Sequence, residues 1–305
     1  MGTIVTRTAI ATAVCAWLLG SGAMPASAQE TPAEYQAVLK ALGKSGDYKE
    51  GVLKVNIPRN DVRVTIGGRP APTPFGFGGW IALTKGEGGN EVMMGDLVLT
   101  EDEVNPVMSA VLTSGLDVTA LHNHFFWDTP RMYFMHVHGM GTAADLTTRI
   151  KPAIDLIDQA AKRAPAAGPA PAPAAATAAL DSAPLAKIIG HAGEQNGSVF
   201  KITIGRPDIN LREHGAPINS RMGLNTWAAF AGSNTDAMVA GDIAMLDTEV
   251  TPVLGALRAN GLNAVALHHH MTGVAPMVIF VHYYGTGQAA ALATGVRAAV
   301  DLLGK

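Results

Sequence analysis

Eight of the ten histidines in this 305-residue chain fall within two short windows. Side chains at alternating positions of a β-strand project from the same face, and both windows contain histidines at this spacing. Neutral imidazole is a good ligand for Zn, Cu, Ni and Fe, so the pattern indicates transition-metal chemistry. The clustered residues are His122, His124, His136 and His138 in the first window, and His268, His269, His270 and His282 in the second.

The first window has the pattern of a β-hairpin whose turn is centred on Pro130, midway between His124 and His136. In a symmetric hairpin, His124 would lie opposite His136 and His122 opposite His138, so all four side chains would share one face. Opposed Cβ atoms are about 5 Å apart, which lets three imidazoles converge on one ion at about 2.0 to 2.1 Å. A slip of one residue would instead place the histidines of the two strands on opposite faces.

The second window repeats three of these four positions and has Tyr284 at the fourth, while His269 should face the other way. We therefore predict one histidine-based metal site on the hairpin of each repeat, with Zn or Cu as the expected ion. Methionines near both hairpins leave Cu(I) ligation open, although methionine is also ordinary core filler. The predicted metal ligands are His122, His124, His136, His138, His268, His270 and His282.

Three functions are compatible with such a set of histidines. The first is an exported protein that binds a transition metal. The second is a metal-dependent hydrolase, because a three-histidine site leaves a coordination position open for water or substrate. The third is a metal-free module that binds a small polar ligand or has a structural role in the cell envelope. No Ser-His-Asp order, phosphate loop or dinucleotide fingerprint is evident, so no catalytic residue is assigned.

The two windows belong to an internal duplication. When the chain is shifted by 146 residues, residues 95–141 and 241–287 are identical at 18 of 47 positions. Upstream the offset becomes 147, which aligns Trp80 with Trp227 and Arg59 with Arg206. We expect the tryptophans in the core. The arginines could hold an anionic ligand or pair with the aspartates two residues further along the chain.

Two kinds of carboxylate also recur at equivalent positions. Asp96 and Asp242 follow a glycine within a predicted strand. They could orient a histidine, bind the metal, or be ordinary strand-end carboxylates. Glu103 and Glu249 stand in the first turn of a predicted helix, at a spacing that favours capping over general-base chemistry.

Alternating apolar residues and capping signals predict a mixture of strands and helices in each repeat. Neighbouring strands are joined by short turns, so we expect an α+β fold. It would consist of two tandem homologous repeats, each a mainly antiparallel sheet with two helices. In the first repeat, strands are expected at 52–55, 62–65, 79–83, 92–99, 117–125 and 132–138, and helices at 101–114 and 143–157.

Composition divides the chain into five segments. Arg7, the apolar stretch 9–19 and the small residues before Gln29 predict a cleaved secretory signal peptide. We therefore expect a periplasmic or secreted protein with neither a lipid anchor nor a stable membrane span after cleavage. The segments are a signal peptide at 1–28, an N-terminal lead-in at 29–50, repeat 1 at 51–158, an Ala/Pro-rich linker at 159–196 and repeat 2 at 197–305.

Charge and cysteine content limit the partners. The formal net charge is −3 and no basic block is present, so nucleic acid is not expected as a partner. Cys15, the only cysteine, lies within the predicted signal peptide. The mature chain would then have neither a disulfide nor a thiolate ligand. A metal ion or a small polar ligand is the expected partner, and the sequence indicates no particular protein partner.

A distinctive motif spans the first hairpin. It reads Leu121-His122-Asn123-His124-Phe125-Phe126, followed by His136-Val137-His138-Gly139. This motif resembles the LppY/LpqO family of bacterial exported proteins. The resemblance extends over both repeats and implies an envelope or secreted protein with a duplicated domain of unknown function, without an assigned catalytic residue. The second repeat departs from the motif at His269 and Tyr284, and Cys15 lacks the sequence context for the lipid attachment known in the family.

Overall fold

The computed structural model of the chain describes residues 1–2, 29–163 and 180–305. The predicted signal peptide, apart from its first two residues, and the most Ala/Pro-rich part of the predicted linker lie outside these residues. Within the described parts, the main helices and strands follow one another in the same order in the two halves. This equivalence agrees with the duplication that the sequence predicts.

The first half contains three α-helices, one large sheet and a small accessory sheet. The large sheet is antiparallel and has the order of strands β1-β2-β5-β6-β9-β7, while β3, β4 and β8 form the accessory sheet. The elements are α1 (Ala33–Leu42), β1 (Gly46–Lys49), β2 (Val52–Pro58), β3 (Val64–Ile66), β4 (Arg69–Ala71), η1 (Thr73–Phe75), β5 (Gly78–Lys85), η2 (Glu87–Gly89), β6 (Glu91–Thr100), α2 (Val104–Thr113), β7 (Asp117–His122), β8 (Asp128–Thr129), β9 (Met132–Gly141) and α3 (Ala143–Arg163).

The second half repeats this plan. Its large sheet is also antiparallel, with the order β10-β11-β14-β15-β17-β16, and β12 pairs with β13. The elements are α4 (Ser182–Ile189), β10 (Gly193–Asn196), β11 (Val199–Gly205), β12 (Arg212–Glu213), β13 (Ala216–Pro217), η3 (Ser220–Met222), β14 (Asn225–Gly232), β15 (Ala237–Leu246), α5 (Asp247–Ala259), β16 (Asn263–His268), β17 (Val278–Gly287) and α6 (Ala289–Val300).

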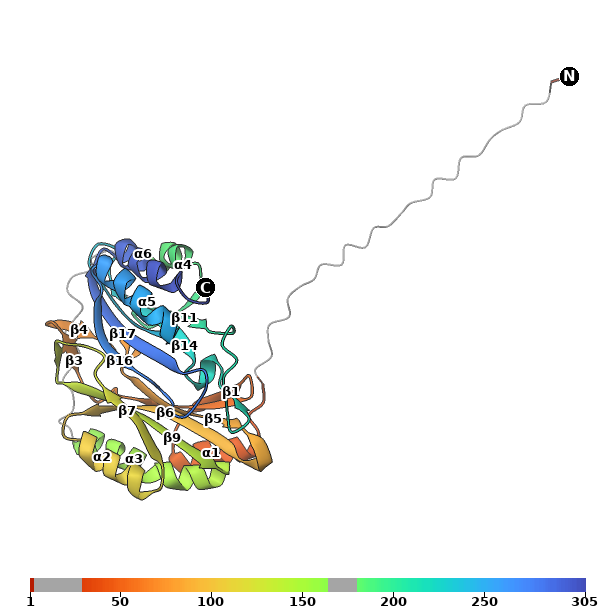
Figure 1. Cartoon of the computed structure of the whole chain (residues 1–305), viewed down its shortest axis with the longest axis vertical. Coiled ribbons are helices and arrows are strands. Elements are labelled where there is room, and N and C mark those ends of the chain that lie inside the picture. The colour runs from red at the N-terminus through yellow and green to blue at the C-terminus, as the bar shows by residue number, and fades with distance from the viewer. Residues whose placement is uncertain (3–28, 164–179) are drawn as a thin grey trace.

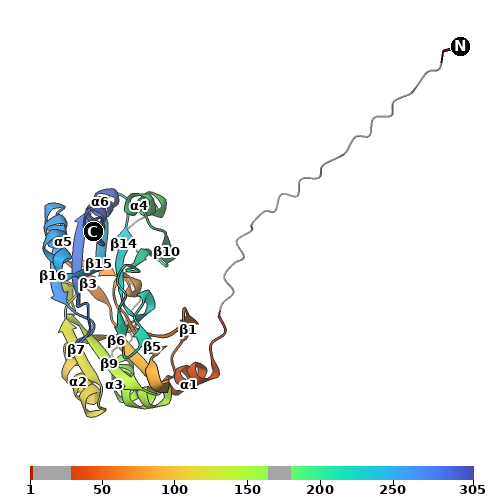
Figure 2. The same ribbon diagram turned by 45° about the vertical axis from the view of Figure 1, so that its right-hand side comes forward.

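The two large sheets face each other in the middle of the molecule, and the helices lie outside them (Figures 1 and 2). The buried apolar cluster beneath α1, α2 and α3 comes only from the first half, and the cluster beneath α4, α5 and α6 only from the second. Two further clusters combine residues of both halves and lie between the sheets. The molecule therefore has four layers, helix–sheet–sheet–helix, and the expected α+β class with mainly antiparallel sheets is confirmed.

Strand β6 illustrates how both faces of a sheet are used. Met93 and Leu97 pack beneath the helices, whereas Met94 and Asp96 point toward the other sheet. Because both faces are covered, the strand is an almost continuous apolar run. Asp96 is the polar exception near the middle of this run, and its place on the inner face directs it to the space between the sheets.

A long connection in each half leaves its own sheet and packs between the two sheets. The connection between β2 and β5 brings Phe75 into a core that includes Ala229 of the second sheet. The connection between β11 and β14 brings Met222 into a core that includes Ala82 of the first sheet. The two halves therefore share these cores. This exchange explains why the strand expected at 62–65 lies in the accessory sheet and not in the large one.

The segments before each predicted repeat also belong to the two sheets. Helix α1 and strand β1 lie within the expected lead-in, 29–50, and α4 and β10 lie within the expected linker, 159–196. Gly46 and Gly193 begin edge strands that pair in the same way with β2 and β11. Each structural repeat therefore begins earlier in the chain than its predicted boundary.

A buried arginine connects the start of a helix to the sheet in each half. Arg59 donates hydrogen bonds to Glu103 and to Asp61, and Glu103 also accepts one from the backbone N–H of Thr100 at 2.7 Å. The equivalent residues of the second half make the same contacts. The glutamates thus have the capping contact that the sequence favoured. Of the two roles open for Arg59, pairing with Asp61 is the one observed.

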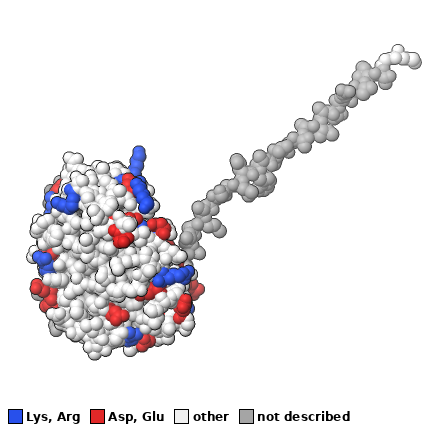
Figure 3. Space-filling view, viewed as in Figure 1, with Lys and Arg blue, Asp and Glu red and all other residues white. Residues whose placement is uncertain are grey.

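The face of the molecule shown in Figure 3 carries no large patch of one charge. None of the described helices combines the length and the apolar character needed to cross a membrane. On the face shown in Figure 3, basic and acidic side chains are intermixed, and large areas carry neither.

Candidate metal centre

Six histidines, three from each hairpin, meet between the two sheets. His122 and His268 occupy equivalent positions, and their ring centroids lie 3.9 Å apart. On either side of this pair, the two equivalent ring pairs His124–His282 and His136–His270 are separated by 3.6 and 4.1 Å. The six-histidine cluster therefore has an approximate twofold arrangement that follows the duplication. Its members are His122, His124, His136, His268, His270 and His282.

The hairpin strands place these rings by a register different from the predicted one. The predicted pairs His124–His136 and His122–His138 are both wrong. His136 lies opposite Ala120 and His122 opposite Phe134, a displacement of four residues at each. A bulge between Val118 and Ala120 and the end of β7 at His122 make the hairpin asymmetric. The shared face survives because a displacement by an even number of residues leaves every side chain on its side of the sheet.

Two of the six histidines lie just beyond the end of a strand. His124 follows β7, and its ring lies 3.2 Å, centroid to centroid, from that of Phe134 in a stacked arrangement. His270 follows β16 and stacks on Phe280 in the same way at 3.5 Å. Each phenylalanine therefore gives a loop histidine a defined position beside the strand histidines.

Two groups of three histidines have ligand nitrogens close enough to hold one metal ion. One is His122, His268 and His282, and the other is His136, His268 and His270. In each group the ligand atoms lie within 4.8 Å of one another. Both groups combine residues of both repeats, and among the described residues no such group comes from one hairpin alone. The expectation of a separate cluster on each hairpin is thus replaced by a single shared one.

Backbone carbonyl groups orient two of the rings. His282 Nδ1 lies 3.2 Å from the carbonyl oxygen of Gly241, and His136 makes the corresponding hydrogen bond to the backbone of Gly95. A histidine whose Nδ1–H donates to a carbonyl presents an unprotonated Nε2, which is the arrangement typical of metal-bound histidines. The Nε2 atoms of both rings are buried without a hydrogen-bond partner.

Asp242 lies directly against the cluster. Its Oδ2 is 3.5 Å from Nε2 of His270 and 3.9 Å from Nε2 of both His268 and His282. Burial raises the pKa of Asp242 well above its usual value, and burial together with the charge of Asp242 raises the pKa of Asp96 to about 7. A cation at the cluster would stabilise the carboxylate of Asp242. Of the roles left open for Asp242, a position beside the histidines is the one observed.

Burial keeps the histidines in the form that binds metals. It lowers the pKa of all six rings, to about 3 for His122 and His270, and neighbouring imidazoles add to the effect at several of them. The rings are therefore neutral at pH 7, and neutral imidazole is the metal ligand.

Many ring nitrogens of the cluster have no hydrogen-bond partner. Buried polar atoms are rarely left unpaired, because each costs about 1 to 3 kcal/mol. Nε2 of His268 and of His270 lie 3.1 Å apart, close to the spacing of about 3.3 Å between two nitrogens bound to one tetrahedral ion. The donor set therefore fits a transition metal ion. The unpartnered atoms are both ring nitrogens of His122 and His124, Nε2 of His136 and His282, and Nδ1 of His268 and His270.

A cavity of about 760 Å³ opens beside the cluster, between the two sheets. His124, His270 and His282 form part of its wall. Trp80 and Trp227, which the sequence placed in the core, are half-buried and line this cavity instead.

The cavity is also lined by two lysines that the sequence analysis did not single out as functional residues. Lys54 lies over the ring of Trp80 and Lys201 over that of Trp227, each 4.3 Å from the centroid. Their equivalence can be read from the sequence, because the 147-residue offset that aligns the tryptophans also aligns Lys54 with Lys201.

Two histidines of the windows stay outside the cluster. His138 Nε2 lies 3.0 Å from Glu213 Oε1, so this predicted ligand faces a carboxylate of the second half. His269 belongs to neither three-histidine group. Most methionines near the hairpins, such as Met135 and Met271, pack in the apolar cores.

The chain belongs to the family described as Domain of Unknown Function (DUF1259), whose model matches residues 36–156 and 183–302. The two matches correspond to the two halves of the structure, so the chain carries this domain twice. No curated protein matches the chain.

Three solved structures are similar to the chain at low sequence identity. The trimeric bacterial microcompartment shell protein PduB has 10% identity over 85% of this chain and 90% of its own, with a TM-score of 0.21. EtuB from Clostridium kluyveri has 9% identity over 84% and 90%, with a TM-score of 0.19. The ethanolamine utilization protein EutL from Leptotrichia buccalis has 12% identity over 70% and 79%, with a TM-score of 0.17. Scores this low carry no argument about function.

Proposed function

We propose that this DUF1259-family protein is exported and binds a transition metal ion at one centre shared by the hairpins of its two repeats. The observation that carries the proposal is the six-histidine cluster, in which buried ring nitrogens from both halves face one another without hydrogen-bond partners. Packing alone does not explain it, because burying several unpaired polar atoms together destabilises a fold.

The ligand set we propose is centred on His268. This residue is common to the two three-histidine groups and lies beside Asp242. His122 with His282, or His136 with His270, would complete three nitrogen ligands. Asp242 would then be a fourth ligand or a partner that orients the rings.

Zn²⁺ and Cu²⁺ are the ions we propose. Imidazole and carboxylate donors suit both. Cu(I) prefers sulfur donors, and the methionines nearest the hairpins are mostly occupied in the apolar cores.

Export rests on the N-terminal sequence. The signal-peptide pattern ends before Gln29, and the motif from Leu121 onwards resembles the LppY/LpqO family of exported proteins. We therefore propose a periplasmic or secreted location without a lipid anchor. Detection of a chain that begins at Gln29 in the exported fraction of expressing cells, by N-terminal sequencing, tests this part.

Elemental analysis of purified residues 29–305 tests the metal centre. We expect bound zinc or copper in the wild-type protein and a large loss in His268→Ala. His269→Ala is the matched control, because it removes an adjacent histidine that belongs to neither three-histidine group. Circular dichroism on each variant checks that it is folded. A wild-type protein that retains no metal and takes up neither Zn²⁺ nor Cu²⁺ on titration contradicts the proposal, as does equal binding by the two variants.

The cavity beside the cluster favours a second candidate, a metal-dependent hydrolase. His124, His270 and His282 line this cavity, so a small molecule inside it could reach the centre. A bound metal ion would supply an activated water at neutral pH. Faster hydrolysis of p-nitrophenyl acetate by the zinc-loaded wild type than by His268→Ala supports this function, and equal rates contradict it.

A further inference from the structure

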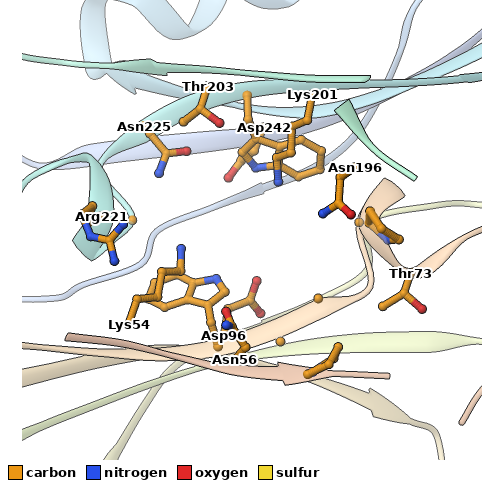
Figure 4. Close-up of a pocket in the computed structure, with 18 of the residues that line it drawn as sticks. Lys54, Asn56, Thr73, Asp96, Asn196, Lys201, Thr203, Arg221, Asn225 and Asp242 are labelled. Carbon is orange, nitrogen blue, oxygen red and sulfur yellow. The ribbon is translucent and has the colours of Figure 1, made fainter. Parts of the chain in front are cut away.

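Two equivalent lysines extend into the cavity from opposite sheets. Lys54 lies on β2 and Lys201 on β11, and their neighbours Leu53 and Phe200 pack beneath the helices. Because side chains alternate along a strand, both lysines are directed into the space between the sheets. Figure 4 shows them reaching toward each other across that space.

Neither ammonium group forms a salt bridge among the residues that the structure describes. Each lies over an indole ring instead, Lys54 over Trp80 and Lys201 over Trp227. Burial lowers the pKa of both lysines to about 8, and the charge of Lys201 adds to the lowering at Lys54. Lysine side chains normally extend to water, so two that turn inward and repel each other indicate a place for negative charge.

The carboxylates of Asp96 and Asp242 are the nearby charges that act to raise the pKa of Lys201. Asp242 faces three histidines of the cluster, and Asp96 occupies the equivalent position on the other sheet. A metal cation at the cluster would take up the negative charge of Asp242. Arg221, a third basic residue of the wall, already pairs with Asp47 at 3.0 Å, while Glu194 is exposed to solvent. The carboxylate of Asp96 would then be the one negative charge acting on both ammonium groups, which leaves an excess of positive charge in the cavity.

We propose that the cavity binds a small organic anion, whose carboxylate or phosphate group is held between the ammonium groups of Lys54 and Lys201. This inference rests on the proposed metal centre and names the class of ligand that reaches it. The cavity volume of about 760 Å³ falls within the range of about 300 to 1,000 Å³ common for small-molecule sites. Asn56 on the first sheet and Thr203 and Asn225 on the second also line the cavity and offer hydrogen bonds to the rest of the ligand (Figure 4).

The anion would lie beside the metal centre. His124, His270 and His282 line the same cavity as the lysines, so a ligand anchored between the lysines can extend to the cluster. The competing explanation is that Lys54 and Lys201 only offset the charges of the two aspartates. Substitution of the lysines separates the two explanations, because only the first predicts the loss of anion binding.

Isothermal titration calorimetry of the zinc-loaded chain 29–305 tests the inference, with inorganic phosphate and succinate as separate probes. We expect saturable binding of at least one probe, accompanied by a change in tryptophan emission because two indole rings touch the site. Lys54→Met and Lys201→Met should each weaken binding by about tenfold, the loss of one charged hydrogen-bond donor, and the double variant should not bind. The probe that binds distinguishes a phosphate from a carboxylate ligand.

Lys151→Met on the surface of α3 is the matched control, because it removes the same charge outside the cavity wall. Thermal unfolding of each variant confirms that it is folded. The inference is overturned if the wild type saturates with neither probe, or if the folded double variant binds as tightly as the control. Metal content is measured in the same samples. Lysine-dependent binding by a chain that takes up no metal supports the anion site and overturns the proposed centre.

Discussion

The two hairpins share three histidines and differ at a fourth position, where the first has His138 and the second Tyr284. His138 lies 3.0 Å from Glu213 and outside the six-histidine cluster. Tyr284 packs edge-on against Phe125 and Trp127. The positions that both copies retain are those whose rings meet between the sheets, whereas the position that differs lies at the margin. The histidines that both repeats share therefore form the six-histidine cluster, and the position at which the repeats differ lies at the edge of the cluster.

The halves also contribute unequally to the centre. His268 belongs to both three-histidine groups, whereas its equivalent, His122, belongs to one. Asp242 lies within 4 Å of three histidines, while the described contacts include none of this kind for Asp96. The second half therefore supplies more of the ligand set, and substitutions at equivalent positions test this asymmetry.

The largest difference is expected between His268→Ala and His122→Ala. Loss of His268 removes a ligand from both groups, so metal affinity should fall by more than the roughly 10- to 100-fold that follows loss of an outer partner. His122→Ala leaves the group of His136, His268 and His270 intact and should have a smaller effect. Competition titrations with a zinc-binding dye measure both. Equal losses at the two positions would show that the halves contribute alike.

The next difference concerns the two aspartates. Asp242→Asn should weaken metal binding by about 10- to 100-fold, because it removes the charge beside three imidazoles while keeping the shape of the side chain. Asp96→Asn should weaken it less. The same dye competition serves as the measurement, and a stronger effect of Asp96→Asn would reverse the assigned asymmetry.

A smaller effect, on stability alone, is expected at the glycines that precede these aspartates. A Cβ on Gly241 would lie 2.1 Å from the carbonyl oxygen of Trp227. One on Gly95 would lie 3.0 Å from the equivalent carbonyl oxygen, that of Trp80, and its closest contacts would be side-chain methyls of Ile81 and Val137 at 2.8 Å. Methyl groups can move aside more easily than a backbone carbonyl. Gly241→Ala should therefore destabilise the fold by about 2 to 3 kcal/mol and Gly95→Ala by about 1 kcal/mol. Urea unfolding of the two variants decides the order.

The smallest effect on the metal is expected from His138→Tyr, which gives the first hairpin the residue of the second. The metal content should not change, because His138 lies outside the cluster. Stability should fall by about 1 to 3 kcal/mol, since Glu213 is buried and loses its nearby ring nitrogen. Elemental analysis and urea unfolding measure the two outcomes. A marked loss of metal would place His138 back among the ligands.

Local sequence patterns were sufficient to predict much of the fold and to show that the histidines of each hairpin share one face of the sheet. Alternation and the repeat offset predicted antiparallel sheets, hairpins and three equivalent histidines in each copy. The predicted pairing was wrong, yet His122 and His136 still share a face, because the displacement is an even number of residues. The bulge between Val118 and Ala120, which shifts the register by one further residue, has no clear local signal.

The cavity could not be predicted in the same way. Trp80 and Trp227 were expected in the core. In a strand that is covered on both sides, the residues of both faces are mostly apolar, so the sequence does not show which face a residue occupies. Which face meets helices and which meets the other sheet depends on how the layers stack. The proposed role of Lys54 and Lys201 depends on that stacking, since they approach each other from opposite sheets (Figure 4).

From the order of residues alone one obtains the duplication, the strand periodicity and the three histidines that each copy presents on one face. Only the folded chain decides that the two faces meet. His122 and His268 are 146 positions apart in the sequence, and their ring centroids are 3.9 Å apart in space. The physical reason is that sheets pack face to face to bury apolar surface from distant parts of the chain, and this non-directional effect leaves no local pattern to show which surfaces meet.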